Sequence, residues 1–194
     1  MGDLQLAVLT TLWAWSGKGQ LIATDDIPEA IEDLKWLDIT VDEIVKCAEH
    51  ASAQDTANTL LEEGKAYNCY CSSAELREMN ASAPGSPEAI IYDGRCRLLS
   101  DDDKKALTKA GRVPRVRLSI SDDPAKLLPK RLHAFLPKQL GDFVIFEDGT
   151  PTTPFSAALN DQRSKTTHSM LHAEDKAWVH QRVLAISVLD GTSP

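Results

Sequence analysis

The stretch Cys69-Tyr70-Cys71, followed by Tyr92-Asp93-Gly94-Arg95-Cys96, gives the strongest indication of the local fold in this sequence of 194 residues. Zinc binds thiolate sulfur at about 2.3 Å, and structural zinc sites usually take four ligands from two short clusters. Cys69 and Cys71 would supply two ligands, and Tyr92 and Cys96 would supply the other two. Tyrosinate is an unusual zinc ligand, and no histidine follows directly after Cys96 to replace it. The residues alone leave two interpretations, a structural zinc site or buried free cysteines that behave as small hydrophobic residues.

The composition predicts a cytoplasmic protein with no membrane partner. No apolar run approaches the roughly 20 residues that a helix needs to cross a bilayer, and the residues after Met1 lack the positive region of a signal peptide. Four cysteines, with Cys47 remote from the other three, argue against a disulfide framework. The formal net charge of −8 argues against broad nonspecific binding of nucleic acid, although it leaves room for a local basic patch.

Hydrophobic patterns that alternate between helix and strand predict an α/β fold. Residues 4–15 carry apolar side chains on most sides, which predicts a largely buried helix. In residues 113–120, apolar residues alternate with Arg115 and Arg117, a pattern typical of a half-exposed strand. Ser-x-x-Glu at residues 72–75 and the acids after Ser100 predict capped helix starts. One further expected helix has Pro28 in its first turn, and two others cover residues 41–63 and 174–189. The remaining expected strands cover residues 20–23, 66–71 and 141–150.

The order of these segments resembles the glutamyl-tRNA synthetase family, including its short paralogue that glutamylates a modified base of the tRNA for aspartate. The resemblance rests on residues 61–71, 92–97, 116–118 and 141–152. It implies a class I synthetase catalytic domain, in which a Rossmann-like parallel sheet is interrupted by a connective insertion that meets the acceptor end of tRNA. It further implies a partial Rossmann-like nucleotide-binding half over residues 1–64, an α/β connective insertion over 65–138, and a second partial Rossmann-like half over 139–194.

The resemblance also implies a metal and a reaction. In this family the insertion often carries zinc, bound by Cys-x-Cys and a later Cys, with either a His or a Tyr completing the site. Cys69, Cys71, Tyr92 and Cys96 match the version with tyrosine, so the resemblance favours the zinc interpretation. The implied reaction is the ATP-dependent ligation of glutamate to tRNA through a glutamyl-adenylate.

Several positions of the implied amino-acid pocket depart from the family pattern. Ile22 replaces an arginine, Thr24 replaces the acidic group that reads the substrate ammonium, and Thr153 replaces a tyrosine. His172 replaces the arginine that would pair bidentately with the glutamate carboxylate. The two signatures that hold ATP in the family do not occur in this sequence. We therefore expect the reaction to be impaired or absent in this chain alone, with ATP bound only if the family activity is retained, and we assign no catalytic residue.

The sequence leaves a noncatalytic alternative open. In it, the chain is a pseudo-synthetase that binds the tRNA acceptor stem, or a protein partner that supplies the missing elements. A further alternative is a chain with no independent activity. Basic residues that could contact RNA phosphates fall in the implied insertion, although scattered surface charges would give the same composition. These residues are Arg95, Arg97, Arg112, Arg115, Arg117, Lys130, Arg131 and Lys138.

Overall fold

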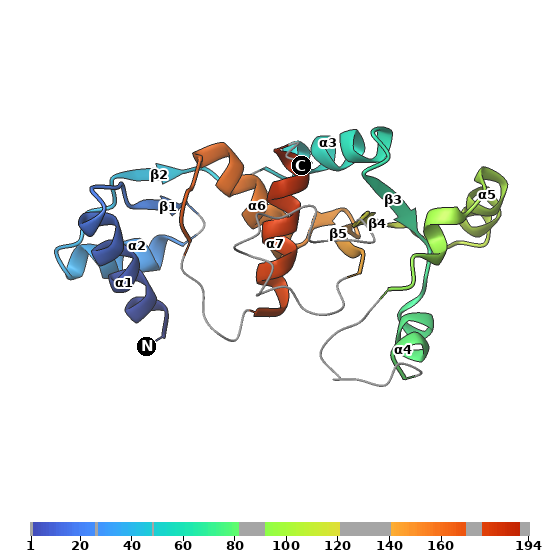
Figure 1. Ribbon diagram of the computed structural model, residues 1–194, viewed down its shortest axis with the longest axis horizontal. Coiled ribbons are helices and arrows are strands. Elements are labelled where there is room, and N and C mark those ends of the chain that lie inside the picture. The colour runs from blue at the N-terminus through green and yellow to red at the C-terminus, as the bar shows by residue number, and fades with distance from the viewer. Residues whose placement is uncertain are drawn as a thin grey trace.

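The computed structural model describes residues 2–25, 27–47, 49–81, 92–120, 141–169 and 176–190, arranged along one long axis (Figure 1). The helices are α1 (Gly2–Ser16), α2 (Pro28–Trp36), α3 (His50–Glu62), α4 (Ser73–Ala81), the short 3-10 helix η1 (Arg95–Leu98), α5 (Asp101–Lys109), α6 (Thr153–Ser164) and α7 (Lys176–Leu189). The strands are β1 (Ile22–Thr24), β2 (Glu43–Val45), β3 (Ala66–Cys69), β4 (Arg115–Leu118), β5 (Phe143–Glu147) and β6 (Thr150–Pro151). None of the described helices has both the length and the apolar character needed to span a membrane.

The strands form two separate sheets. β1 and β2 pair in parallel, with Ile22 opposite Glu43, and this is the parallel pairing seen among the described residues. The larger sheet has the order β3-β4-β5-β6, and all its pairs are antiparallel. The α/β class is therefore confirmed. The larger sheet joins strands from two of the three predicted regions, so the proposed boundary near residue 138 does not separate two sheets.

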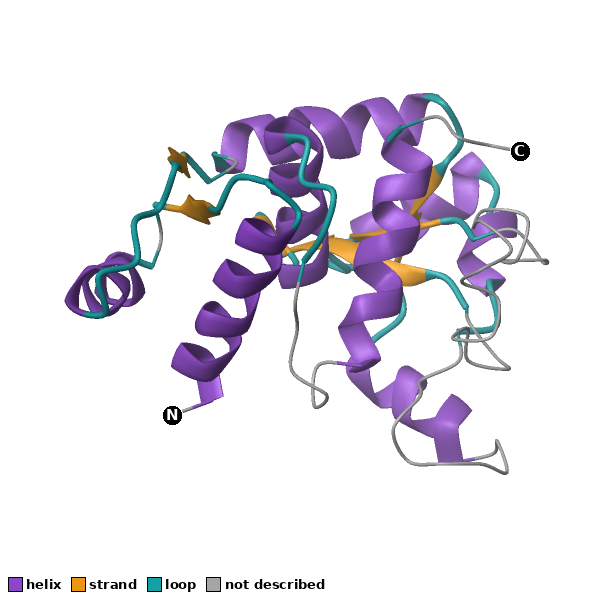
Figure 2. Ribbon diagram, turned by 60° about the vertical axis from the view of Figure 1, so that its left-hand side comes forward, coloured by secondary structure: helices purple, strands orange, loops and turns teal. Residues whose placement is uncertain are grey.

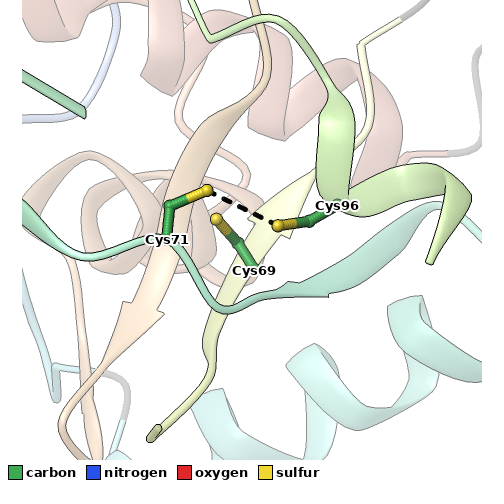
Figure 3. Close-up of side chains that lie close together, drawn as sticks. All are labelled: Cys69, Cys71 and Cys96. Carbon is green, nitrogen blue, oxygen red and sulfur yellow. Dashed lines mark hydrogen bonds between the residues drawn. The ribbon is translucent and has the colours of Figure 1, made fainter. Parts of the chain in front are cut away.

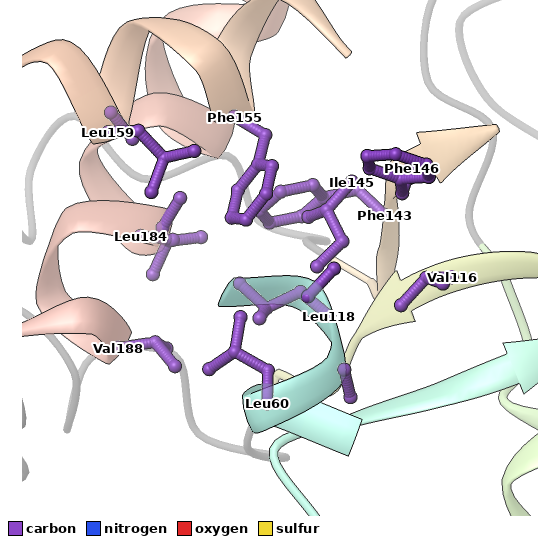
Figure 4. Packing of buried hydrophobic residues seen from close by; sticks show 14 of the residues in the cluster. Leu60, Val116, Leu118, Phe143, Ile145, Phe146, Phe155, Leu159, Leu184 and Val188 are labelled. Carbon is purple, nitrogen blue, oxygen red and sulfur yellow. The ribbon is translucent and has the colours of Figure 1, made fainter. Parts of the chain in front are cut away.

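One face of the larger sheet carries the main core (Figure 4). Side chains alternate between the two faces of a strand, and in β4 this places Val116 and Leu118 in the core. α3, α6 and α7 cover this face, and Phe155 of α6 and Leu184 of α7 are fully buried there. Burying an aromatic or a leucine side chain contributes about 1.5–3 kcal/mol relative to leaving it exposed. This core therefore holds the central part of the molecule together.

The other face of the same sheet carries polar and sulfur-bearing side chains. Arg117 is only 5% exposed, so the prediction that it lies on the exposed side of a half-exposed strand is wrong. Tyr67 stands directly opposite Arg117 in the β3–β4 ladder, and Cys69 follows Tyr67 by two residues. The alternation was predicted correctly, but a second cluster of buried residues covers the face that was expected to meet water.

The N-terminal end of the molecule has a smaller core, formed by Leu21, Leu34 and Ile39. Residues 4–15 are helical as predicted, but α1 is not largely buried, because Trp13 and Trp15 are more than half exposed. Its N-terminal end projects away from the rest of the chain, as the label N in the turned view of Figure 2 shows.

The remaining helices partly match the predictions. The expected helix over 41–63 is wrong in its first part, where β2 pairs with β1 before α3 begins at His50. α6 was not predicted. Both capped starts are confirmed: the Ser72 hydroxyl accepts from the Glu75 N–H at 3.2 Å, and Ser100 and Asp103 form a reciprocal capping box.

Candidate metal centre

Two short local structures carry the four candidate ligands. Cys69 ends β3, and Cys71 lies just before the capped start of α4. Tyr92 precedes η1, which contains Cys96. Gly94 between them has a φ of 76°, a left-handed conformation that glycine adopts without strain. This turn lets the Cys96 backbone N–H donate to the Tyr92 hydroxyl oxygen at 3.1 Å, so both side chains stay on the same side.

The three cysteine side chains point toward one another (Figure 3). All are buried, and their sulfur atoms lie within 4.8 Å of one another. The Cys71 and Cys96 sulfurs are 3.6 Å apart. The Tyr92 hydroxyl oxygen lies 3.4 Å from the Cys69 sulfur and 3.5 Å from the Cys71 sulfur. All four predicted ligand residues are therefore brought to one place.

Three of these separations fit a tetrahedral metal: Cys71 to Cys96, and Tyr92 to Cys69 and to Cys71. With metal–sulfur bonds of about 2.3 Å and a metal–oxygen bond of about 2.0 Å, tetrahedral donors lie about 3.8 Å apart between sulfurs and about 3.5 Å apart between sulfur and oxygen. The sulfur–oxygen distances of 3.4 and 3.5 Å match the second value, and 3.6 Å approaches the first. Three thiolates and a phenolate would suit zinc or another thiophilic divalent ion.

Without a cation, the Cys71 thiol and the Tyr92 phenol would hold their protons. Burial raises the pKa of Cys71 to about 12. Burial and hydrogen bonds to the three cysteine side chains raise the pKa of Tyr92 above its ordinary value. Burial also acts to raise the pKa of Cys69, but hydrogen bonds from Tyr92 and Arg117 lower it overall. Metal binding here would therefore release protons, since thiolate and phenolate are the binding forms.

A buried polar network lies beside the cluster. The Asp142 side chain is 2% exposed, and its carboxylate accepts from Arg97, from the Tyr67 hydroxyl and from the Ile120 backbone N–H at 2.7 Å. The Arg117 guanidinium lies 4.0 Å from the centre of the Tyr92 ring and donates to the Asp142 backbone oxygen at 3.0 Å. Asp142 had no predicted role. Its position directly before the apolar strand β5 is the feature that could have indicated a buried carboxylate.

The predicted RNA-contacting arginines already have partners within the protein. Arg95 pairs with Asp93 at 2.8 Å, Arg112 with Glu75 at 2.8 Å, and Arg115 with Glu147 at 2.6 Å. Arg97 pairs with Asp142, and Arg117 is buried. Arg95 and Arg112 are the most exposed of the five, so they are best placed to reach a phosphate. Lys130, Arg131 and Lys138 lie outside the described residues.

The implied amino-acid pocket is seen only in part. Ile22 and Thr24 are half-buried in β1, whereas Thr153 is exposed at the start of α6, after the other sheet. His172 lies outside the described residues. The described structure therefore places Ile22 and Thr24 on β1 and Thr153 on α6, and their common pocket stays a prediction.

Comparison with known proteins gives the same family that the sequence resembles. The family described as tRNA synthetases class I (E and Q), catalytic domain, matches residues 23–190. The glutamate–tRNA ligase of Heliobacterium modesticaldum is 33% identical over 184 residues, which cover 88% of this chain and 36% of that protein. The glutamate–tRNA ligase of Trichodesmium erythraeum is 29% identical over 220 residues, covering 100% of this chain and 25% of that protein. The chain thus spans about a third or less of these relatives.

Solved structures agree in fold. The glutamate-tRNA synthetase from Elizabethkingia anophelis has a TM-score of 0.61 at 19% identity, covering 95% of this chain and 43% of that one. A glutamate tRNA ligase from Elizabethkingia meningosepticum, in complex with its amino acid, has a TM-score of 0.60 at 19% identity, covering 93% of this chain and 43% of that one. The chain therefore belongs to the class I tRNA synthetases (E and Q), as a part of their catalytic domain.

Proposed function

We propose that this chain is the zinc-bearing part of a glutamate–tRNA ligase. Cys69, Cys71, Tyr92 and Cys96 would hold a structural zinc ion, and the segment around it would meet the tRNA acceptor stem. The single observation that carries the proposal is the convergence of four buried donors at tetrahedral spacing inside a domain of this family. The ion would fix the Tyr92–Cys96 turn against the end of β3, because site formation and local folding are coupled.

The proposed reaction is the family's ATP-dependent ligation of glutamate to tRNA, weakened in this chain by its pocket. Ile22 and Thr24 offer no charge to a bound α-amino acid, and an unpaired buried charge costs transition-state binding. None of the described residues forms a recognisable ATP-phosphate site, so we assign no step to ATP. The division at residues 64/65 and 138/139 and a cytoplasmic location belong to the same proposal.

The deciding experiment is glutamate-dependent ATP–pyrophosphate exchange, measured with and without tRNA. We expect little exchange by the natural chain, because its described residues form no recognisable ATP-phosphate site. The double variant Ile22→Arg, Thr24→Glu restores charges of the pocket, so it should bind glutamate more tightly than the natural chain, as measured by calorimetry. The matched control is Thr40→Glu, which adds a carboxylate at an exposed position outside β1. Glutamate binding that is as weak in the double variant as in the natural chain would contradict a ligase pocket.

The noncatalytic alternative makes a different prediction for the same samples. A tRNA-binding module would bind tRNA in a salt-dependent way, with no glutamate binding in either the natural chain or the double variant. If the chain binds no tRNA and the double variant binds no glutamate, both functions are contradicted.

A further inference from the structure

Two arginines lie beside Asp142, and they differ in exposure. The Arg97 side chain is 34% exposed, whereas Arg117 is only 5% exposed. Arg97 takes the Asp142 carboxylate, with its Nε 3.0 Å from one carboxylate oxygen and its Nη2 bonded to the other. Tyr67 and the Ile120 N–H occupy further acceptor positions of the same carboxylate. Arg117, the buried arginine of the two, donates instead to the Asp142 backbone oxygen.

Arg117 has no carboxylate partner in the part of the chain that the structure describes. It is 95% buried, its Nη1 donates to a backbone oxygen, and its Nε has no hydrogen-bond partner. Leaving a charge buried without a counterion costs several kcal/mol. The position of Arg117 is therefore explained only when an anion lies beside it.

The metal centre is the anion within reach. Arg117 lies over the Tyr92 ring, 4.0 Å from its centre, and the Tyr92 hydroxyl oxygen is 3.4 Å from the Cys69 sulfur. Three thiolates and a phenolate carry four negative charges, and a divalent ion would leave two. A guanidinium stacked on the phenolate ring reduces this excess and also fixes the orientation of the ring.

We infer that Arg117 is the counterion and positioning residue of the metal centre, holding Tyr92 as the fourth ligand. The inference rests on the zinc site proposed above. It adds that the occupied site is anionic and that its stability depends on a cation from the neighbouring strand β4. Residues that orient metal ligands from outside the coordination sphere typically change metal affinity 10- to 100-fold when they are replaced.

The test compares Arg117→Met with Arg115→Met. Methionine keeps much of the side-chain volume and removes the charge. Arg115 is the matched control because it lies two residues away on β4 and its guanidinium pairs with Glu147 instead. Zinc affinity, measured by competition with a chromophoric chelator, should fall about 10- to 100-fold in Arg117→Met and stay near the natural value in Arg115→Met. Arg117→Lys, which keeps the charge but not the planar stack, should be intermediate.

A second measurement separates a counterion from a merely structural residue. Thermal unfolding of the natural chain and of Arg117→Met is followed with bound zinc and with excess chelator. A counterion role predicts that the variant loses more stability in the zinc-loaded protein than in the metal-free protein, because the excess negative charge of the four ligands is present only in the loaded state. Equal loss in both states, or failure of the variant to fold in either, would show that Arg117 serves the fold alone and would overturn the inference.

The outcome also distinguishes this inference from the proposed function. A natural chain that holds no zinc refutes the metal site, and the inference with it. A natural chain that holds one equivalent of zinc, with the same affinity in Arg117→Met, keeps the metal site and refutes only the role of Arg117.

Discussion

Two regions of this molecule differ in which side chains they bury and which they expose. Around the cysteine cluster, charged and sulfur-bearing groups are buried, and Asp142, Tyr67 and Arg97 satisfy one another. At the N-terminal end, large apolar groups are left in contact with solvent, and Trp36 of α2 is 82% exposed. Burying polar groups requires many well-placed partners, whereas exposing apolar groups requires none.

This difference indicates which part of the molecule contributes most to its stability. β1 and β2 make a two-stranded parallel pair, and isolated two-stranded sheets are marginally stable in water. Parallel sheets are normally covered on both faces. The larger sheet is covered on one face by the main core and on the other by the cysteine cluster. We therefore expect the stability of this chain to depend mainly on the larger sheet.

The largest effect should come from removing a metal ligand. Cys96→Ser leaves three donors and a buried hydroxyl, so zinc affinity should fall by more than the 10- to 100-fold typical of outer residues. Metal content of the purified protein and near-ultraviolet circular dichroism of the region around Tyr92 would report the loss. Cys47→Ser is the matched control, because Cys47 belongs to neither ligand cluster. Full zinc content in Cys96→Ser would refute the ligand assignment.

The next largest effect comes from comparing a buried position of the main core with an exposed position at the N-terminal end. Phe155→Ala should lower the free energy of unfolding by about 3–5 kcal/mol, because it leaves a cavity at a fully buried position. Trp36→Ala should change it by no more than about 0.5 kcal/mol, although it removes a larger side chain, because Trp36 is mostly exposed. Urea denaturation of both variants gives the two values. Similar losses would mean that Trp36 is covered in solution and that the contrast between the ends is false.

The smallest effect concerns the ion pair that attaches α4 to the strand segment before β4. The side-chain hydrogen bond from Arg112, followed by the backbone hydrogen bond from Ser72, lowers the pKa of Glu75 to about 2. A lowered pKa stabilises the folded state above the ordinary pKa of 4.5, and this contribution is lost as the pH falls from there toward about 2. The pair is exposed to solvent, so its contribution should be below about 1 kcal/mol.

Urea denaturation over this pH range would measure that contribution. Glu75→Gln should flatten the pH dependence slightly, whereas Glu62→Gln, which changes an exposed acid of α3, should not. An unchanged pH dependence in Glu75→Gln would show that the pair does not stabilise α4 in solution.

The strands of the larger sheet and both capped helix starts could be predicted because their signals are local, whereas the antiparallel pairing of these strands was not predicted. The alternation in β4 and the Ser-x-x-Glu pattern at Ser72 depend on neighbouring residues alone. β2 was missed because its three residues acquire strand structure only by pairing with β1. α6 was missed because Pro151 and Pro154 suggest a loop, although a proline in the first turn suits a helix.

The convergence of Cys69, Cys71, Tyr92 and Cys96 could be predicted from spacing and family resemblance, but the surroundings of this cluster could not. Nothing local to Arg117 indicates that it is buried, since alternating arginines usually mark a solvent-exposed face. Its environment depends on Tyr92 and Asp142, which are distant in sequence. Long-range partners of this kind decide which polar groups are buried, and a single sequence does not reveal them.

The candidate ligands come as two local pairs, and this arrangement affects the conformational entropy of the unfolded chain as well as the folded structure. A metal that joins Cys69 and Cys71 to Tyr92 and Cys96 closes a loop between residues 71 and 92, as a covalent cross-link would. The entropy of closing a flexible loop grows only with the logarithm of its length, by about 0.6 kcal/mol for each doubling. Since each pair is shaped by its own turn, residues inserted between the pairs would cost little, and this part of the chain can lengthen while the metal centre keeps its geometry.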